Sequence, residues 1–128
     1  CDVLSVKYEL GVRTRWSYQN KRKWDLVLLA NREYTVLPSL IKKYKDAFEK
    51  QWMAENKPCG FDVQDISLAG VIARVESCRD RLFDFTDAEI DRIEELECEI
   101  LPFGGNAKGQ SIYYNKKRAI VTASAFSQ

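Results

Sequence analysis

One apolar stripe at helical spacing dominates the middle of the chain and limits what the chain can fold into. Its five large side chains recur at intervals of 4, 3, 4 and 4 residues: Leu37, Ile41, Tyr44, Phe48 and Trp52. This spacing places them on one face of a helix, while charged residues fill the opposite face. Pro38 suits a first helical turn, because that turn needs no N–H donor from proline. The pattern therefore predicts an amphipathic helix from about Pro38 to about Asn56.

Two further helical segments are predicted before this helix. The first covers about residues 2–18. Its stripe is Leu4, Tyr8, Gly11, Arg15 and Tyr18, and Val3, Val6 and Leu10 widen the apolar face. Glycine costs a helix about 1 kcal/mol relative to alanine, so Gly11 indicates a close approach by a neighbouring helix or a bound partner. Asn20 is the expected N-cap of the second segment, which runs from Lys21 to about Val36 and turns Trp24 inward.

Two helical segments are also predicted after the Pro-Cys-Gly break at residues 58–60. Asp65 suits the N-cap of the first, and Ala69 and Gly70 leave room on it for a neighbour. Its stripe is Leu68, Ile72, Val75, Cys78, Leu82 and Phe85. Residues 86–89 have the spacing of a capping box, so they open a further helix or mark a bend in one long helix. The tail from residue 104 onward is left open between helical and extended pieces.

Few breaks interrupt these stripes, since the 128 residues contain only 6 glycines and 3 prolines. Four or five apolar stripes joined by short breaks predict an all-α fold, an up-and-down bundle of four to five helices. The length fits one domain over residues 1–128. The chain lacks an initiator methionine and enters an apolar pattern at once, so we expect it to be part of a longer chain.

The absence of histidine removes most self-contained catalytic chemistry. It excludes Ser-His-Asp and Cys-His catalysis, most zinc sites and the Glu-x-x-His ligands of di-iron bundles. The 4 cysteines form no C-x-x-C pair. The run from Asp84 to Glu99 holds eight carboxylates, but most of them fall opposite the isoleucines and predict a solvated face. We therefore expect no catalytic residue, no metal site and no cofactor within this chain.

Charge gives no reason to expect nucleic acid or a membrane as a partner, because 20 basic residues balance 19 acidic ones. Two clusters, residues 13–16 and 21–24, mix basic and aromatic side chains as nucleic-acid binders do. Helical spacing, however, should turn their tryptophans inward and leave the cations solvated. No run of 18 apolar residues and no signal sequence occurs, so a cytoplasmic location is expected.

A polar stretch around the Pro-Cys-Gly break is the strongest candidate for a functional contact. Aromatic, amide and charged residues gather there at one helix-to-helix corner: Trp52, Glu55, Asn56, Lys57, Asp62 and Asp65. One interpretation is a hydrogen-bonded corner in which Asp62 or Asp65 caps the next helix. The other is a polar patch that contacts a partner domain or a ligand. Composition favours the first and leaves the second open.

Three segments of the chain together resemble a known family. They are residues 4–18 around Lys7-Tyr8-Glu9-Leu10-Gly11, residues 52–66 around Glu55-Asn56-Lys57-Pro58, and residues 90–101 around Glu94-Glu95-Leu96-Glu97. From about residue 3 to residue 125 the chain resembles the C-terminal helical domain of bacterial N-acetyl-β-D-glucosaminidases of glycoside hydrolase family 20. After Ile66 the resemblance leads us to expect an arginine and two glycines, whereas the chain continues Ser67, Leu68, Ala69, Gly70. A domain contact made by that arginine is therefore in question.

The resemblance implies a supporting role in an exo-acting enzyme that removes terminal N-acetylhexosamine residues. Catalysis would lie in an upstream (β/α)8 barrel, where an Asp-Glu pair acts with the acetamido group of the substrate. This domain would pack against the barrel, assist a homodimer or line one side of the substrate cleft. The corner residues, with Arg13 and Arg15, are the expected interdomain or cleft-side contacts. The alternatives are a free-standing helical interaction module and a bundle that binds a small molecule.

Overall fold

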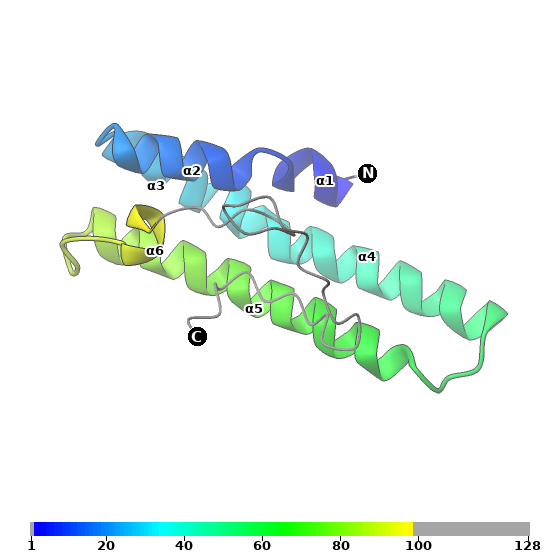
Figure 1. Ribbon diagram of the computed structural model, residues 1–128. Helices are drawn as coiled ribbons and strands as arrows, with labels where there is room; N and C mark the ends of the chain where they lie inside the picture. Colours follow the sequence, from blue (N-terminus) through cyan, green and yellow to red (C-terminus); the bar gives the residue numbers. More distant parts are fainter. Residues whose placement is uncertain (1, 99–128) are drawn as a thin grey trace, which may run out of the picture. The chain divides into compact units, whose positions relative to one another are not determined.

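The computed structural model describes residues 2–98, and these residues form helices joined by turns, with no strand among them. Residues 1–96 make up one compact unit, to which the following description applies. The helices are α1 (Asp2–Lys7), α2 (Leu10–Gln19), α3 (Lys23–Asn31), α4 (Glu33–Glu55), α5 (Phe61–Thr86) and α6 (Glu94–Glu97) (Figure 1). The all-α prediction is confirmed. The expected tail pieces lie outside the described residues, and the single domain over residues 1–128 stays a prediction.

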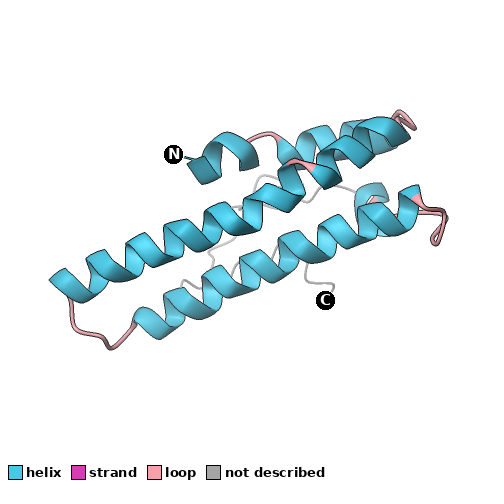
Figure 2. Ribbon diagram, turned by 180° about the vertical axis from the view of Figure 1, so that it is seen from behind, coloured by secondary structure: helices cyan, strands magenta, loops and turns pink. Residues whose placement is uncertain are grey.

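The helices follow an up-and-down course in three rows. α1 and α2 make the first row, α3 and α4 run back beside them, and α5 returns along both α3 and α4. Figures 1 and 2 show α4 and α5 side by side as a long hairpin that is closed by residues 56–60. The first row covers α3 and the beginning of α4, so the closed end of the hairpin extends beyond it. The predicted helical bundle is confirmed.

The first row is two helices rather than the single predicted one. α1 ends at Lys7 and α2 begins at Leu10. The amide of Tyr8 still donates to the Leu4 carbonyl, at 2.9 Å. No described atom lies within 4 Å of a Cβ built on Gly11 or on Gly70, so the close helix approach predicted from these glycines is wrong. Both positions face open space instead.

The second row breaks earlier than predicted. Asn20 ends α2 by donating its side-chain amide to the Trp16 carbonyl at 2.8 Å, and does not cap α3. The row breaks at Arg32, between α3 and α4, where the Thr35 hydroxyl donates to the Ala30 carbonyl at 2.8 Å. Pro38 consequently lies inside α4. The apolar face on both sides of the proline is buried, and this burial offsets the one helical hydrogen bond that proline cannot donate.

The third row ends where a further helix was predicted to begin. The Thr86 hydroxyl donates at 3.0 Å to the Phe83 carbonyl, which belongs to the last turn of α5. The hydroxyl therefore caps no following helix. Ala88 then has a positive φ of 63°, which turns the chain. The capping-box prediction is wrong, since no helix begins at residues 86–89 and, up to residue 98, the short α6 is the one helix that follows. Ile93 is nevertheless buried as expected, and its amide donates to the Tyr18 hydroxyl at 3.0 Å.

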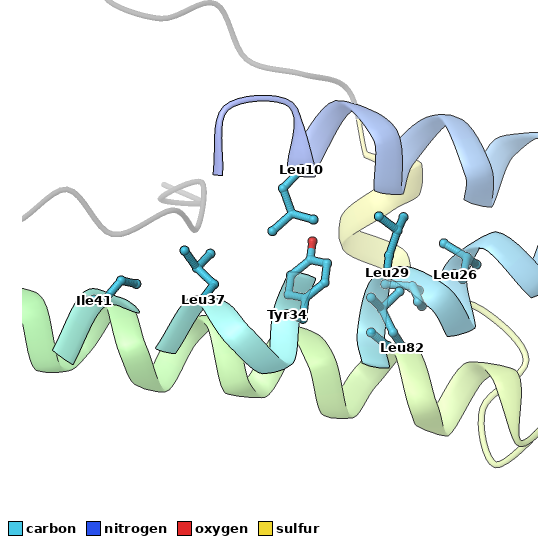
Figure 3. Packing of buried hydrophobic residues seen from close by; sticks show 9 residues of the cluster. Leu10, Leu26, Leu29, Tyr34, Leu37, Ile41 and Leu82 are labelled. Carbon is cyan, nitrogen blue, oxygen red and sulfur yellow. The ribbon is translucent and has the colours of Figure 1, made fainter. Parts of the chain in front are cut away.

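The core lies at the open end of the hairpin, where all three rows meet (Figure 3). Its buried residues are Leu10, Leu26, Leu29, Ala30, Tyr34, Leu37, Ile41, Leu82 and Ile93. The Tyr34 hydroxyl reaches Thr14 of α2 at 3.0 Å, and the Thr14 hydroxyl lies 2.7 Å from the Leu10 carbonyl. This pairing lets a polar group enter the core without an unmade hydrogen bond. Burial raises the pKa of Tyr34.

Candidate interdomain contact surfaces

Six of the eight predicted contact residues come together at the closed end of the hairpin. They are Trp52, Glu55, Asn56, Lys57, Asp62 and Asp65, and we call this group the corner. α4 ends there as the Asn56 amide donates to the Trp52 carbonyl at 2.8 Å and Asn56 adopts an extended backbone. The Trp52 indole N–H donates to the Lys57 carbonyl at 2.9 Å. The corner is therefore held by its own hydrogen bonds.

Neither of the two carboxylates expected to cap α5 is its N-cap, so that prediction is wrong. Gly60 is the N-cap, with a φ of +100° that side chains rarely adopt, and α5 begins at Phe61. The Asp62 carboxylate accepts from the Gly60 amide at 3.1 Å, so it stabilises this turn. Asp65 lies inside α5 and caps nothing; it forms an ion pair with Lys45 of α4. The hydrogen bond that Lys45 donates to Asp65 in this ion pair raises the pKa of Lys45.

Aromatic side chains hold the two helices together beneath the corner. The rings of Tyr44 and Phe48 stack at 5.8 Å, and the Phe61 ring lies 6.0 Å from those of both Phe48 and Trp52. Phe61 is buried, whereas Glu55, Asn56 and Lys57 remain exposed. The corner thus presents polar groups beside an aromatic cluster that joins α4 to α5.

Arg13 and Arg15 do not join the corner. Both lie in α2, which packs beside α3, whereas the corner is at the far end of α4. The Arg13 guanidinium pairs with Glu33 at 3.2 Å, and Arg15 is half-buried. The resemblance placed these arginines with the corner as contacts, and the fold separates the two groups. Their role as contacts stays a prediction.

An exposed apolar row lies on the first two helices, and it includes Leu4 and Tyr8, which the sequence analysis wrongly placed in a packing stripe. It runs along α1 and α2 and consists of Leu4 (66% exposed), Tyr8 (84%), Val12 (74%) and Trp16 (50%); we call it the α1–α2 stripe. The inward orientation expected for the tryptophans is wrong, because Trp24 is also 71% exposed. The face that turns inward is instead Leu10 with Thr14 and Ser17.

A signal for this stripe was present in the sequence. Val3 and Val6 pack on the core together with Leu10, so the first ten residues carry a second apolar row besides the one through Leu4 and Tyr8. Two such rows on one narrow helix pair exceed what a single core can cover. The sequence analysis joined both rows into one apolar face, because the inward row continues through polar residues of α2, which hide its periodicity.

The chain matches the glycoside hydrolase 20C C-terminal domain over residues 1–115. It belongs to this family. The match confirms the resemblance to a family 20 C-terminal helical domain, and it includes both the corner and the α1–α2 stripe. No curated protein matches the chain.

A glycoside hydrolase 20C C-terminal domain fits the expected non-catalytic part of a hexosaminidase. Within residues 2–98 no three His, Cys, Asp or Glu side chains lie together as metal ligands would. None of the described helices is long and apolar enough to cross a membrane. Cys59 is exposed, whereas burial raises the pKa of the Cys78 thiol.

Proposed function

We propose that this chain is the non-catalytic C-terminal domain of an exo-acting β-N-acetylglucosaminidase and packs against the catalytic barrel of that enzyme through the α1–α2 stripe. The family supports the first part of this proposal. The exposed stripe supports the second, and it is the observation that carries the proposal. A cytoplasmic location belongs to the same proposal, and cell fractionation checks it.

The stripe has the character of a contact that lacks its partner. Its four large side chains follow one another along one row, and contiguous apolar patches on monomeric proteins usually mark interaction sites. Burying one such side chain fully is worth roughly 1.5–3 kcal/mol. A barrel in the same polypeptide would meet the stripe at a high effective concentration, so a modest apolar contact suffices to hold the two together.

The corner supports a second contact of a different kind. Glu55, Asn56 and Lys57 are exposed next to the aromatic cluster that joins α4 to α5. Polar groups held in this way suit hydrogen bonding to loops at one side of the substrate cleft or to a second copy of the enzyme. We assign the corner to such a contact, and the stripe to packing on the barrel.

Paired substitutions in the longer enzyme test this assignment. Tyr8→Ser with Val12→Ser should lower its thermal midpoint and increase amide exchange in the barrel, because the apolar contact is lost. Asn56→Ala with Asp62→Ala should lower hydrolysis of a β-N-acetylglucosaminide more than it lowers the midpoint. Val63→Ser with Ile66→Ser is the matched control, since these α5 residues are also exposed. An unchanged stripe variant, or a control with the same loss, contradicts docking through the stripe; an unchanged corner variant contradicts the corner contact.

A free-standing interaction module is the competing function, and the exposed stripe is equally available to it. The reading frame upstream of residue 1 distinguishes the two, because only the enzyme requires a barrel-sized frame there. The chain alone should not hydrolyse a chromogenic β-N-acetylglucosaminide, and measurable turnover would contradict its non-catalytic role.

A further inference from the structure

A crevice separate from the corner lies between α2 and the junction of α3 with α4. Its volume is about 250 Å³. The lining residues that matter to its chemistry are Arg13, Trp16, Asp25, Leu28, Arg32 and Glu33. Trp16 is half-exposed and also ends the α1–α2 stripe, so the crevice borders the surface assigned to the barrel.

The charges around the crevice balance and are largely paired. Arg13 Nη1 lies 3.2 Å from Glu33 Oε1, and Arg22 Nε lies 2.7 Å from Asp25 Oδ2. An anion entering the crevice would meet both carboxylates, and a cation would meet the guanidinium groups of Arg13 and Arg32. Neither sign of charge is favoured, so the lining selects a ligand without net charge.

The carboxylate and guanidinium groups of the crevice can still form hydrogen bonds with such a ligand. Each carboxylate is engaged through one of its two oxygens in these ion pairs, and a guanidinium has five N–H donors. Hydroxyl groups both donate and accept, so they can bind carboxylate and guanidinium at once. A ligand with several hydroxyl groups therefore suits the polar part of this crevice.

The remaining wall is apolar and partly aromatic. Trp16 and Leu28 form this wall. The Arg22 guanidinium lies 5.1 Å from the centre of the Trp16 indole ring and orients the ring. A pyranose ring has C–H groups that pack against an aromatic face, while its hydroxyls point outward. Pockets for drug-sized ligands hold about 300–1,000 Å³, so this crevice suits one sugar ring.

We propose that this crevice binds one pyranose unit of an uncharged saccharide. The choice of saccharide rests on the proposed function, because the substrate of that enzyme would supply such units. With the barrel docked on the stripe, the crevice lies at a domain boundary, where ligand sites commonly form. The domain would then hold a sugar unit of the glycan beside the catalytic barrel.

Titration of the 128-residue chain with N-acetylglucosamine tests the proposal, since the chain carries its own core. The Trp16 indole N–H and the amides near Asp25 and Glu33 should shift in nuclear magnetic resonance spectra, with a dissociation constant on the order of 1 mM. Trp16→Ala and Asp25→Ala should each weaken binding by at least about tenfold. Trp24→Ala is the matched control, because Trp24 is exposed on α3 and lies outside the crevice. The Trp24→Ala chain should bind N-acetylglucosamine as tightly as the natural chain does.

Three results would overturn the proposal. One is the absence of shifts at about 100 mM sugar, which is about a hundred times the expected dissociation constant, while circular dichroism shows a helical chain. Another is equal binding of sorbitol or glycine, which have no sugar ring. The third is equal loss in the Trp24→Ala control. If the chain alone is not helical, calorimetry on the longer enzyme replaces the titration. Two sugar sites should become one in Asp25→Ala, because Asp25 lines the crevice but lies outside the stripe, and a single site in the natural enzyme overturns the proposal.

The test separates this proposal from docking. The 128-residue chain binds sugar without any barrel, so loss of docking in the longer enzyme leaves the titration unaffected. The stripe variants Tyr8→Ser and Val12→Ser likewise change no residue of the crevice lining.

Discussion

The two ends of the α4–α5 hairpin carry the same apolar stripe in different surroundings. Along α4, Leu37 is 1% exposed and Ile41 2%, yet Tyr44, the next member of the stripe, is 51% exposed. The spacing does not change between these residues, but the first row of helices covers only the open end. Periodicity selects the face of a helix that packs, and the number of neighbouring helices decides how far that face is buried.

The residue types along the stripe follow this change of surroundings. Aliphatic side chains occupy the open end, and the aromatic residues Tyr44, Phe48 and Trp52 occupy the closed end. Aromatic rings remain useful when half-buried, because they contact one another edge-on or stacked and carry polar tips. The indole N–H of Trp52 is such a polar tip, and it donates to the Lys57 carbonyl. The closed end thereby stays ordered with two helices instead of three rows.

The largest expected difference between the two ends is in core packing. Leu37→Ala should lower the free energy of unfolding by about 3–4 kcal/mol, because it leaves a cavity among three rows. Phe48→Ala should cost about 1–2 kcal/mol, since this ring is only half-buried and water can fill its place. Urea denaturation of the chain measures both. Equal losses would show that the two ends are equally packed, and would contradict the difference between them described above.

A smaller effect should be confined to the closed end. Trp52→Phe keeps an aromatic ring but removes the donor to the Lys57 carbonyl, at a cost of about 0.5–1 kcal/mol. Amide exchange should quicken around residues 53–63 and stay unchanged in α3. The matched control is Trp24→Phe, whose exposed side chain should not affect exchange. Faster exchange in α3 as well would mean that the closed end is not a local unit.

The smallest effect concerns an ion pair at the open end, where Arg81 of α5 meets Glu95 of α6 at 3.1 Å. A hydrogen bond from its own backbone amide, and then Arg81, hold the pKa of Glu95 below its usual 4.5. The folded pKa is lowered, so the stabilisation is present above pH 4.5 and is lost as the pH falls through the folded value. Glu95→Gln should cost under about 1 kcal/mol at pH 7, because the pair is half-exposed. Stability measured against pH checks this: a deficit that persists in strong acid contradicts a charge effect.

The corner could be predicted from the sequence because its residues lie within one short stretch. Residues 52–65 include a helix end, a proline, a glycine and a helix start, and any turn with these parts brings their side chains together. Arg13 and Arg15 lie far from this stretch in the sequence, and only the packing of α2 beside α3 places them elsewhere. The crevice could not be predicted from the sequence either, because its walls come from α2 and from the α3–α4 junction.

Packing, together with local hydrogen bonds, explains the wrong element boundaries. Pro38 suited the first turn of a helix, but the helix starts at Glu33, because tertiary burial of Tyr34 and Leu37 outweighs one missing donor. The capping-box pattern at residues 86–89 competed with a turn that returns hydrogen bonds to the end of α5. In both places the sequence allowed two local structures, and packing selected between them.

By itself, the sequence determined that the chain is helical, which faces of α4 and α5 pack, and where their hairpin closes, because periodicity and turn residues act over a few positions. The tertiary structure alone decided which of the two apolar rows on α1 and α2 turns inward and how far the α4 stripe is covered. Both outcomes depend on how many helices compete for one core, and that number is a property of the assembled rows. The exposed stripe, the surface on which the proposed docking rests, is the result of that competition.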